Sequence, residues 1–281
     1  MCDGSLSGVK LGFIGTGNMG GALARAARRR VPEGCIHLAN RTPEKAEALA
    51  EELGCRVSNA AGAAEWADFI FLGVKPQMMA DLLAELRPAL AARQDRFLLV
   101  TMAAGLSINT IQQLAGGDYP VIRIMPNTPA SIGEGMILYT CAENVTSEEE
   151  RLFLDAMAGA GRFSALPEHL MDAGSAVSGC GPAFADLFLE ALADGGVACG
   201  LPRAQAMELA AQMLLGSAKL VLESGQHPGA LKDAVCSPGG STIQGVRALE
   251  QAGFRGAVME AVIAAYEKTL ELALQQKGKV L

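Results

Sequence analysis

Residues 237–242, Ser-Pro-Gly-Gly-Ser-Thr, could bind a small anion without using a charged side chain. Two glycines after a proline are expected to leave the backbone N–H groups of Gly239, Gly240 and Ser241 unshielded, and the apolar periodicity that follows predicts a helix. Free N–H groups at the positive end of a helix bind carboxylate or phosphate. The Thr242 hydroxyl could donate to whatever carries that anion. A tight turn with an ordinary helix cap is the alternative.

A second motif with chemical meaning is Gly-x-Gly-x-x-Gly at Gly15, Gly17 and Gly20. It follows an apolar segment, 9–14, that predicts a strand, and it precedes an alanine-rich segment, 22–27, that predicts a helix. In that context the first glycine permits a tight turn, the second lets backbone approach a pyrophosphate, and the third lets helix pack closely on strand. The motif therefore predicts a dinucleotide site.

The choice of dinucleotide depends on the end of the next predicted strand, 36–39, which runs into Asn40-Arg41-Thr42. NAD sites usually place an acidic residue about 20 positions past the glycines, where it binds the ribose 2′-hydroxyl. Residues 40–42 include no acidic residue, and the positive charge of Arg41 could bind a 2′-phosphate. The sequence predicts NADP(H), with NAD(H) left open as a second cofactor. A solvated arginine before a helix that starts at Thr42 is a compatible alternative.

Further buried strands are predicted at 69–74, 97–100 and 121–124. In an open parallel sheet, ligands bind beyond the carboxyl ends of the strands, so the turns after these strands should line one crevice. Small residues at 103–105 would let a nicotinamide ring lie against backbone, and Lys75 and Asn127 could reach ribose or ring. An ordinary surface role remains open for each of these residues.

After residue 165 the strand signals end. Helices are predicted at 168–178, 183–199, 203–224, 229–235, 241–252 and 256–276. Segment 206–222 is apolar on nearly all sides, which is typical of a buried or interfacial helix. We therefore expect an α/β fold, in which a Rossmann-type doubly wound sheet (1–165) is followed by an all-helical domain (166–281) that forms a homodimer. The small-residue turn at 178–182 could close over the crevice or simply connect helices.

Composition excludes several other classes. Half of the 281 residues are hydrophobic, 19% are charged and the net charge is −7, with no basic run beyond three arginines at 28–30, so nucleic-acid binding is not expected. Residues 1–5 lack a signal-peptide pattern, and no stretch is expected to reach the roughly 18 apolar residues of a membrane span. The seven cysteines are scattered without a CxxC pair, and no histidine is spaced with another ligand. We expect a cytoplasmic protein with reduced thiols and no metal.

Together these motifs resemble the pyrroline-5-carboxylate reductases along essentially the whole chain. The matching segments are 12–19, 74–76, 103–105, 125–129 and 178–182, and the most specific is 228–250, which contains Cys236-Ser237-Pro238-Gly239-Gly240-Ser241-Thr242. The resemblance implies NADPH-dependent reduction of the C=N bond of 1-pyrroline-5-carboxylate to L-proline, the last step of proline biosynthesis. It also implies higher homo-oligomers built from dimers.

The resemblance further implies that the substrate carboxylate is held by amides at Gly240, Ser241 and Thr242, near Val235, and that the catalytic Thr242 hydroxyl bonds the ring nitrogen. The cofactor residues that it implies are Ile14, Gly15, Gly17, Asn18, Met19, Asn40, Arg41, Asn59, Val74, Lys75, Pro76, Met102, Ala103, Ala104 and Asn127. Cys236 replaces the serine or threonine of other family members, which could make it an oxidation-sensitive position.

Two other functions share part of this pattern. The 3-hydroxyacid dehydrogenases have a similar glycine loop but need a lysine on the long helix that joins their domains, and residues 169–200 contain none. A non-enzymatic NADP(H)-binding sensor or scaffold should carry a degraded substrate loop, whereas 237–242 is intact.

Overall fold

The computed structural model describes residues 6–280, with side chains described for residues 6–275. The expectation about a signal peptide at residues 1–5 lies outside the described residues.

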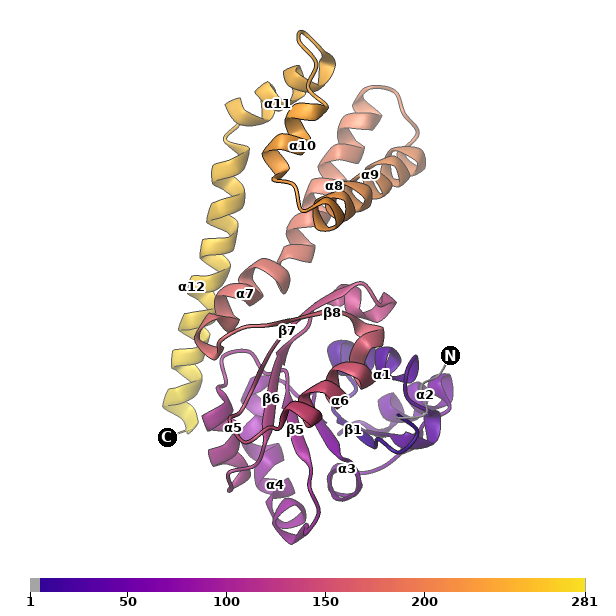
Figure 1. The fold of residues 1–281 in the computed structure, drawn as a ribbon, viewed down its shortest axis with the longest axis vertical. Helices are drawn as coiled ribbons and strands as arrows, with labels where there is room; N and C mark the ends of the chain where they lie inside the picture. Colours follow the sequence, from indigo (N-terminus) through magenta and orange to yellow (C-terminus); the bar gives the residue numbers. More distant parts are fainter. Residues whose placement is uncertain (1–5, 281) are drawn as a thin grey trace. The chain divides into compact units, whose positions relative to one another are not determined.

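Within the described part of the chain, one eight-stranded sheet has the order β3-β2-β1-β4-β5-β6-β7-β8. Figure 1 shows the sheet in the first part of the chain, with β1, β5, β6, β7 and β8 labelled. Its strands are β1 (Leu11–Ile14), β2 (Ile36–Ala39), β3 (Arg56–Val57), β4 (Phe69–Leu72), β5 (Leu98–Thr101), β6 (Val121–Met125), β7 (Gly135–Cys141) and β8 (Gly161–Ala165). Strands β1 to β6 are parallel to one another. Strand β7 pairs antiparallel with β6, and β8 pairs parallel with β7.

The five predicted strands are confirmed as β1, β2, β4, β5 and β6, whereas β3, β7 and β8 were not predicted. Strand β3 has two residues, both exposed. Strands β7 and β8 each begin with glycine and carry polar residues, so neither forms the continuous apolar run that marks a buried parallel strand. They extend the edge of the sheet beyond the part that follows simple hydrophobic patterning.

Helices cover both faces of the sheet, because successive strand residues point to opposite sides. On β1, Phe13 belongs to a core shared with α1 (Asn18–Arg28), α2 (Pro43–Leu53) and α6 (Ser147–Met157). The next residue, Ile14, belongs to a separate core shared with α3 (Ala60–Trp66), α4 (Met79–Ala92) and α5 (Ile108–Ala115). This is the expected doubly wound arrangement.

The helices after β8 confirm the expected all-helical C-terminal region. They are α7 (Met171–Ser178), α8 (Gly181–Ala198), α9 (Arg203–Ser224), α10 (Pro228–Ala234), α11 (Ser241–Gln251) and α12 (Phe254–Val280). The chain divides into two compact units, of which the first holds residues 1–180 together with 265–281 and the second holds 181–264. The domain boundary at residue 165 stays a prediction; it coincides with the end of β8.

The second unit has a small core of its own. Among its described residues Ala193, Ala206 and Ala210 are buried, while Leu187, Leu215 and many other large apolar side chains are more than half exposed. Segment 206–222 is therefore mostly exposed within one chain. A helix with this many exposed apolar side chains is typical of a region that another subunit covers.

One expectation about hydropathy was wrong. The segment Glu168–Ala198 is long and apolar enough, by length and composition only, to count as a candidate membrane span, with a mean hydropathy of 1.2 over an 18-residue window. The segment meets this criterion because α8 is rich in leucine and alanine. The charged residues of α8, Asp186, Glu190 and Asp194, are spaced four apart, so they share one side of that helix.

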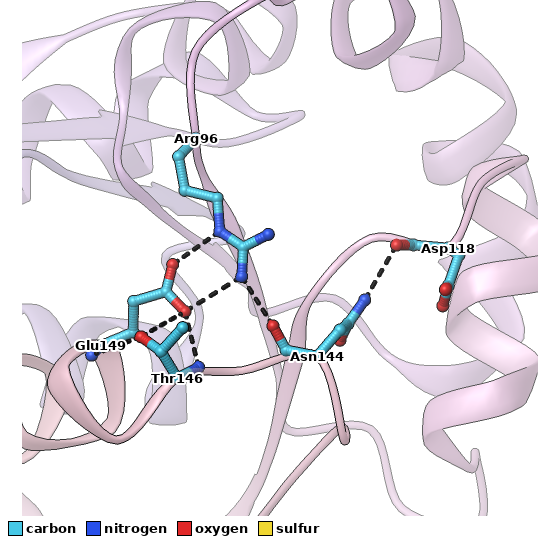
Figure 2. Close-up of polar contacts among 5 residues, drawn as sticks. All are labelled: Arg96, Asp118, Asn144, Thr146 and Glu149. Carbon is cyan, nitrogen blue, oxygen red and sulfur yellow. Dashed lines mark hydrogen bonds and ion pairs between the residues drawn. The ribbon is translucent and has the colours of Figure 1, made fainter.

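A polar network holds the start of α6 against the segments that lead into β5 and β6 (Figure 2). Thr146 and Glu149 form a reciprocal capping box, and Arg96 donates from Nε to Glu149 Oε1 at 2.6 Å. Arg96 also donates from Nη2 to the carbonyl of Asn144 at 2.6 Å, and Asn144 Nδ2 donates to the carbonyl of Asp118 at 2.9 Å. The network ties α6 to the chain just before β5 and just before β6.

The Arg96–Glu149 pair should make stability depend on pH. Hydrogen bonding from Arg96 holds the pKa of Glu149 below its usual range. A carboxyl whose folded pKa is depressed contributes stability above its unfolded pKa, and that contribution is lost as pH falls through the folded pKa. We expect Arg96→Met to lower the free energy of unfolding by about 1 kcal/mol near neutral pH and by much less near pH 3, measured by urea denaturation. The control is Arg151→Met on the same helix, at an exposed residue without a described ion pair; an equal loss at both pH values would contradict the assignment.

Candidate active site

The three motif glycines occupy three different environments. Gly15 has φ +101° and donates its N–H to the carbonyl of Ala39 at 2.8 Å. A Cβ on Gly20 would overlap the carbonyl oxygen of Gly15, whereas a Cβ on Gly17 would meet no atom within 4 Å. Thus Gly15 makes the turn, Gly20 permits close packing and Gly17 leaves open space above the backbone. These are the roles that the motif predicts.

The start of α1 is open to an anion. Gly17 is its N-cap residue and makes no side-chain cap hydrogen bond, so no side chain satisfies the first N–H groups, those of Asn18 and Met19 among them. The preceding residue, Thr16, donates its N–H to Asn40 Oδ1 at 3.1 Å, and Asn40 Nδ2 donates to the carbonyl of Thr42 at 3.0 Å. Asn40 therefore holds the turns after β1 and β2 together.

Two cations near this turn are available for a ligand. Arg41 is exposed, and within residues 6–275 it has no ion pair. Lys45 lines a groove of about 340 Å³ together with Thr16, Gly17 and Asn18. Lys45 also lacks a described ion pair, whereas Arg25 in the same groove is paired with Glu52 at 2.6 Å. Sequence reasoning missed Lys45; the available signal was a second cation one helical turn after Arg41.

The other predicted cofactor residues of the first strands lie in turns, at a helix cap and at the end of a strand. Asn59 is the N-cap of α3, where its Oδ1 accepts the N–H of Gly62 at 2.7 Å. Val74 and Pro76 are partly buried just after β4, and Lys75 between them is exposed without a described ion pair. Ile14, the last residue of β1, is 3% exposed. Direct contact of each with a cofactor stays a prediction.

The turn after β5 presents small residues, as expected. Ala103 is buried and donates its N–H to Thr101 Oγ1 at 3.3 Å, while Ala104 is exposed at the tip. Leu106 closes the turn by donating its N–H to the carbonyl of Ala103 at 3.4 Å. Met102 is partly buried at the start. The backbone at Ala104 is thus accessible to a flat ring.

Asn127, predicted to reach the cofactor, uses both ends of its side-chain amide within the protein. Its Nδ2 donates to the carbonyl of Ser178 at 3.0 Å, and its Oδ1 accepts the N–H of Met136 at 2.9 Å. The residue is 8% exposed. It holds the loop after β6 against β7 and the end of α7, a structural role that the sequence did not indicate.

The Ser-Pro-Gly-Gly-Ser-Thr loop differs from expectation at one amide. Gly239 has φ +69°, and the N–H of Gly240 donates to the carbonyl of Ser237 at 3.0 Å, so this amide is not unshielded. The turn needs that bond to close. Gly240 is instead the N-cap of α11 and makes no side-chain cap hydrogen bond, which leaves the amides of Ser241 and Thr242 without a side-chain partner.

The side chains around this loop are accessible. Thr242 is exposed, with no described hydrogen bond to its hydroxyl, and Val235 is 64% exposed. Cys236 is partly buried as a free thiol. Within residues 6–275, no group of three or more His, Cys, Asp or Glu residues could hold a metal ion. The loop can accept an anion and offers one hydroxyl beside it.

Comparison with known proteins shows which family has this combination. Residues 168–272 match the family model for pyrroline-5-carboxylate reductase dimerisation. The pyrroline-5-carboxylate reductase of Escherichia coli K12 is 43% identical over 267 residues, which cover 94% of this chain and 98% of that protein. The chain belongs to the pyrroline-5-carboxylate reductase family. It is an NAD(P)H-dependent oxidoreductase.

Other relatives of this reductase family agree. The pyrroline-5-carboxylate reductase of Pisum sativum is 41% identical over 266 residues, covering 94% of this chain and 96% of that protein. A crystal structure of the Plasmodium falciparum enzyme with NADP bound superposes with a TM-score of 0.85 at 32% identity, covering 95% and 99% of the two chains. Residues 10–105 match the family model for NADP oxidoreductase coenzyme F420-dependent. Membership of the reductase family replaces the 3-hydroxyacid dehydrogenase alternative.

The two hydrogen bonds of Asn127 generate a stability prediction. Asn127→Ala leaves the Ser178 carbonyl and the Met136 N–H without partners, so we expect a loss of about 2–3 kcal/mol in the free energy of unfolding, measured by urea denaturation at fixed protein concentration. Asn109→Ala, at an exposed asparagine of α5 with no described side-chain hydrogen bond, is the control and should change little. Equal losses in the two variants would show that the Asn127 contacts contribute nothing.

Proposed function

We propose that this reductase transfers a hydride from NADPH to the C=N carbon of 1-pyrroline-5-carboxylate and releases L-proline and NADP⁺. The observation that carries the proposal is the intact loop at 237–242, with uncapped amides at Ser241 and Thr242 in a chain of this family. A sensor or scaffold that only binds NADP(H) would not need an anion site of this kind. In the cell this reaction would complete proline biosynthesis.

The cofactor would be held by the turns at the carboxyl ends of the parallel strands. The first turn of α1 suits the pyrophosphate, because its N–H groups are uncapped and the helix dipole favours negative charge. Arg41, together with Lys45 four residues later, suits the 2′-phosphate of NADP(H). The turn at Met102–Ala104 suits the nicotinamide ring. NAD(H) lacks the phosphate and would bind more weakly.

The substrate carboxylate would lie on the amides of Ser241 and Thr242. Gly240 would contribute by starting α11 without a side chain, since its own N–H is used in the turn. Val235 offers an exposed apolar surface to the ring. The Thr242 hydroxyl would orient the ring nitrogen.

The proton balance can be met without an acidic side chain. Hydride addition to the carbon of the C=N bond leaves an electron pair on nitrogen, which takes one proton. That proton arrives with the substrate as its iminium form or through water, with Thr242 stabilising the nitrogen. NADPH supplies the hydride chemistry, and the protein contributes mainly orientation of two bound molecules.

Assembly and location are part of the same proposal. The exposed apolar residues of α8, α9 and α12 support a homodimer through the helical region, and the family model that matches residues 168–272 is named for dimerisation. Larger assemblies would be built from such dimers. A cytoplasmic location fits a reductase with free cysteines throughout the described part of the chain.

Removing the Thr242 hydroxyl tests the mechanism. The wild type should oxidise NADPH only when 1-pyrroline-5-carboxylate is added, with proline as the product. Thr242→Ala should lower kcat/KM about 10- to 1,000-fold, the scale of one lost hydrogen bond to a charged or developing group, while Thr242→Ser should retain most of the activity. NADPH binding without turnover in the wild type would favour the sensor, and unchanged kinetics in Thr242→Ala would remove this residue from the mechanism.

Reversing the charge at Arg41 tests the cofactor assignment. Arg41→Asp should raise KM for NADPH about tenfold or more and change KM for NADH little, because the carboxylate repels only the 2′-phosphate. Since Arg41 is exposed and has no described ion pair, the variant should unfold at nearly the same temperature as the wild type. Equal use of NADPH and NADH by the wild type would overturn this reading of Arg41.

A further inference from the structure

Hydrogen bonds fix the first residues of the turn after β5. The N–H of Ala103 donates to Oγ1 of Thr101, a residue that is 0% exposed, and the turn closes from Leu106 back to Ala103. Gly105 takes φ +74°, in the left-handed region that favours glycine. Ala104 alone stands out at the tip. The accessible part of the turn thus rests on a rigid base.

The far side of this turn touches the backbone of α12. A Cβ on Gly105 would come within 3.1 Å of both Cα and Cβ of Ala273. Both residues belong to the first compact unit, which includes the last part of α12. A helix backbone cannot rotate aside as a flexible side chain can, so the position of α12 limits how far the turn can move in that direction.

The second half of the turn is held by an ion-pair cluster. The N–H of Ile108 donates to Oε1 of Glu168 at 2.7 Å, and Glu168 lies 3.6 Å from Arg123 Nη1. Arg123 also donates from Nη2 to Asp172 Oδ1 at 2.7 Å, with its side chain 4% exposed. Gly105, Arg123, Asp172 and Ala273 line one cavity of about 380 Å³. Beside this open space, the close approach of Gly105 to Ala273 limits the position of the turn on the side of α12.

We propose that Ala273 is a positioning residue for the cofactor. Through Gly105 it sets where Met102–Ala104 lies, and hence how well that turn fits the nicotinamide half of NADPH. Ala273 needs no contact with the cofactor itself. The inference rests on the proposed function, because it assigns the turn at 102–104 to the nicotinamide.

A matched pair of glycine variants separates this contact from backbone strain. Gly105→Ala and Gly116→Ala each force alanine into the left-handed region, at φ +74° and +82°. The new Cβ meets the backbone of Ala273 in the first case and the side chain of Arg87 in the second. We expect Gly105→Ala to weaken the Kd for NADPH about tenfold and Gly116→Ala to leave it within about twofold, measured by fluorescence titration. Equal effects on Kd would overturn the proposal.

Changes on the helix side complete the test. Ala273→Gly in the Gly105→Ala background removes one of the two clashing atoms and should recover part of the lost affinity; no recovery would count against the contact. Ala273→Val adds bulk at the contact while every residue of the turn stays unchanged, and it should weaken NADPH binding. Its control, Gln275→Val, places the same branched residue at an exposed position of the same helix and should not. If Gly105→Ala does not fold, the comparison of Ala273→Val with Gln275→Val tests the proposal by itself.

The binding measurement also separates this inference from the proposed function. NADPH titration requires no turnover, so wild type that binds NADPH without reducing 1-pyrroline-5-carboxylate would overturn the function only. The inference would be overturned if Ala273→Val left the Kd for NADPH unchanged and lowered the unfolding temperature no more than Gln275→Val does. Ala273 would then have a purely structural role.

Discussion

The rest of the nucleotide-binding unit depends on one close approach between backbones. At the carboxyl ends of β1, β2 and β4, Gly15 donates to Ala39 and Gly73 donates to Ile14, at 2.8 and 2.7 Å. A Cβ on Gly73 would overlap the carbonyl oxygen of Gly15, as would one on Gly20. Only glycine permits this packing. It brings the first turn of α1 directly over the strand ends and leaves its N–H groups exposed.

Both expected binding regions therefore use the same physical device. Each has a glycine at the N-cap of a helix, Gly17 in α1 and Gly240 in α11, without a side-chain cap. An anion can take the place of the missing cap and gains from the helix dipole without bringing its own counter-charge into the site. This suits a reaction in which two anionic molecules must bind and neither needs an acid or a metal from the protein.

Sequence patterns predicted what depends on short-range chemistry. The glycine motif, the continuous apolar run of β4 and the helix start at residue 241 were all found from sequence patterns alone. The pattern failed at β7 and β8, which lie at the edge of the sheet and are less apolar. It also misjudged the Gly240 amide, because a turn closes by a hydrogen bond that the residue types do not specify. The two bonds of Asn127 and the contact of Gly105 with Ala273 join positions far apart in the sequence, so no local signal marks them.

The contact between Gly105 and Ala273 also bears on the order in which the protein can fold during synthesis. Most of the first compact unit is complete by residue 180, yet its last part, 265–281, leaves the ribosome only after the whole second unit has been made. Until then the turn at 103–106 lacks the helix that it rests against. The nascent chain can form its sheet and its glycine-rich turn early, but this part of the expected nucleotide site is completed only at the end of translation.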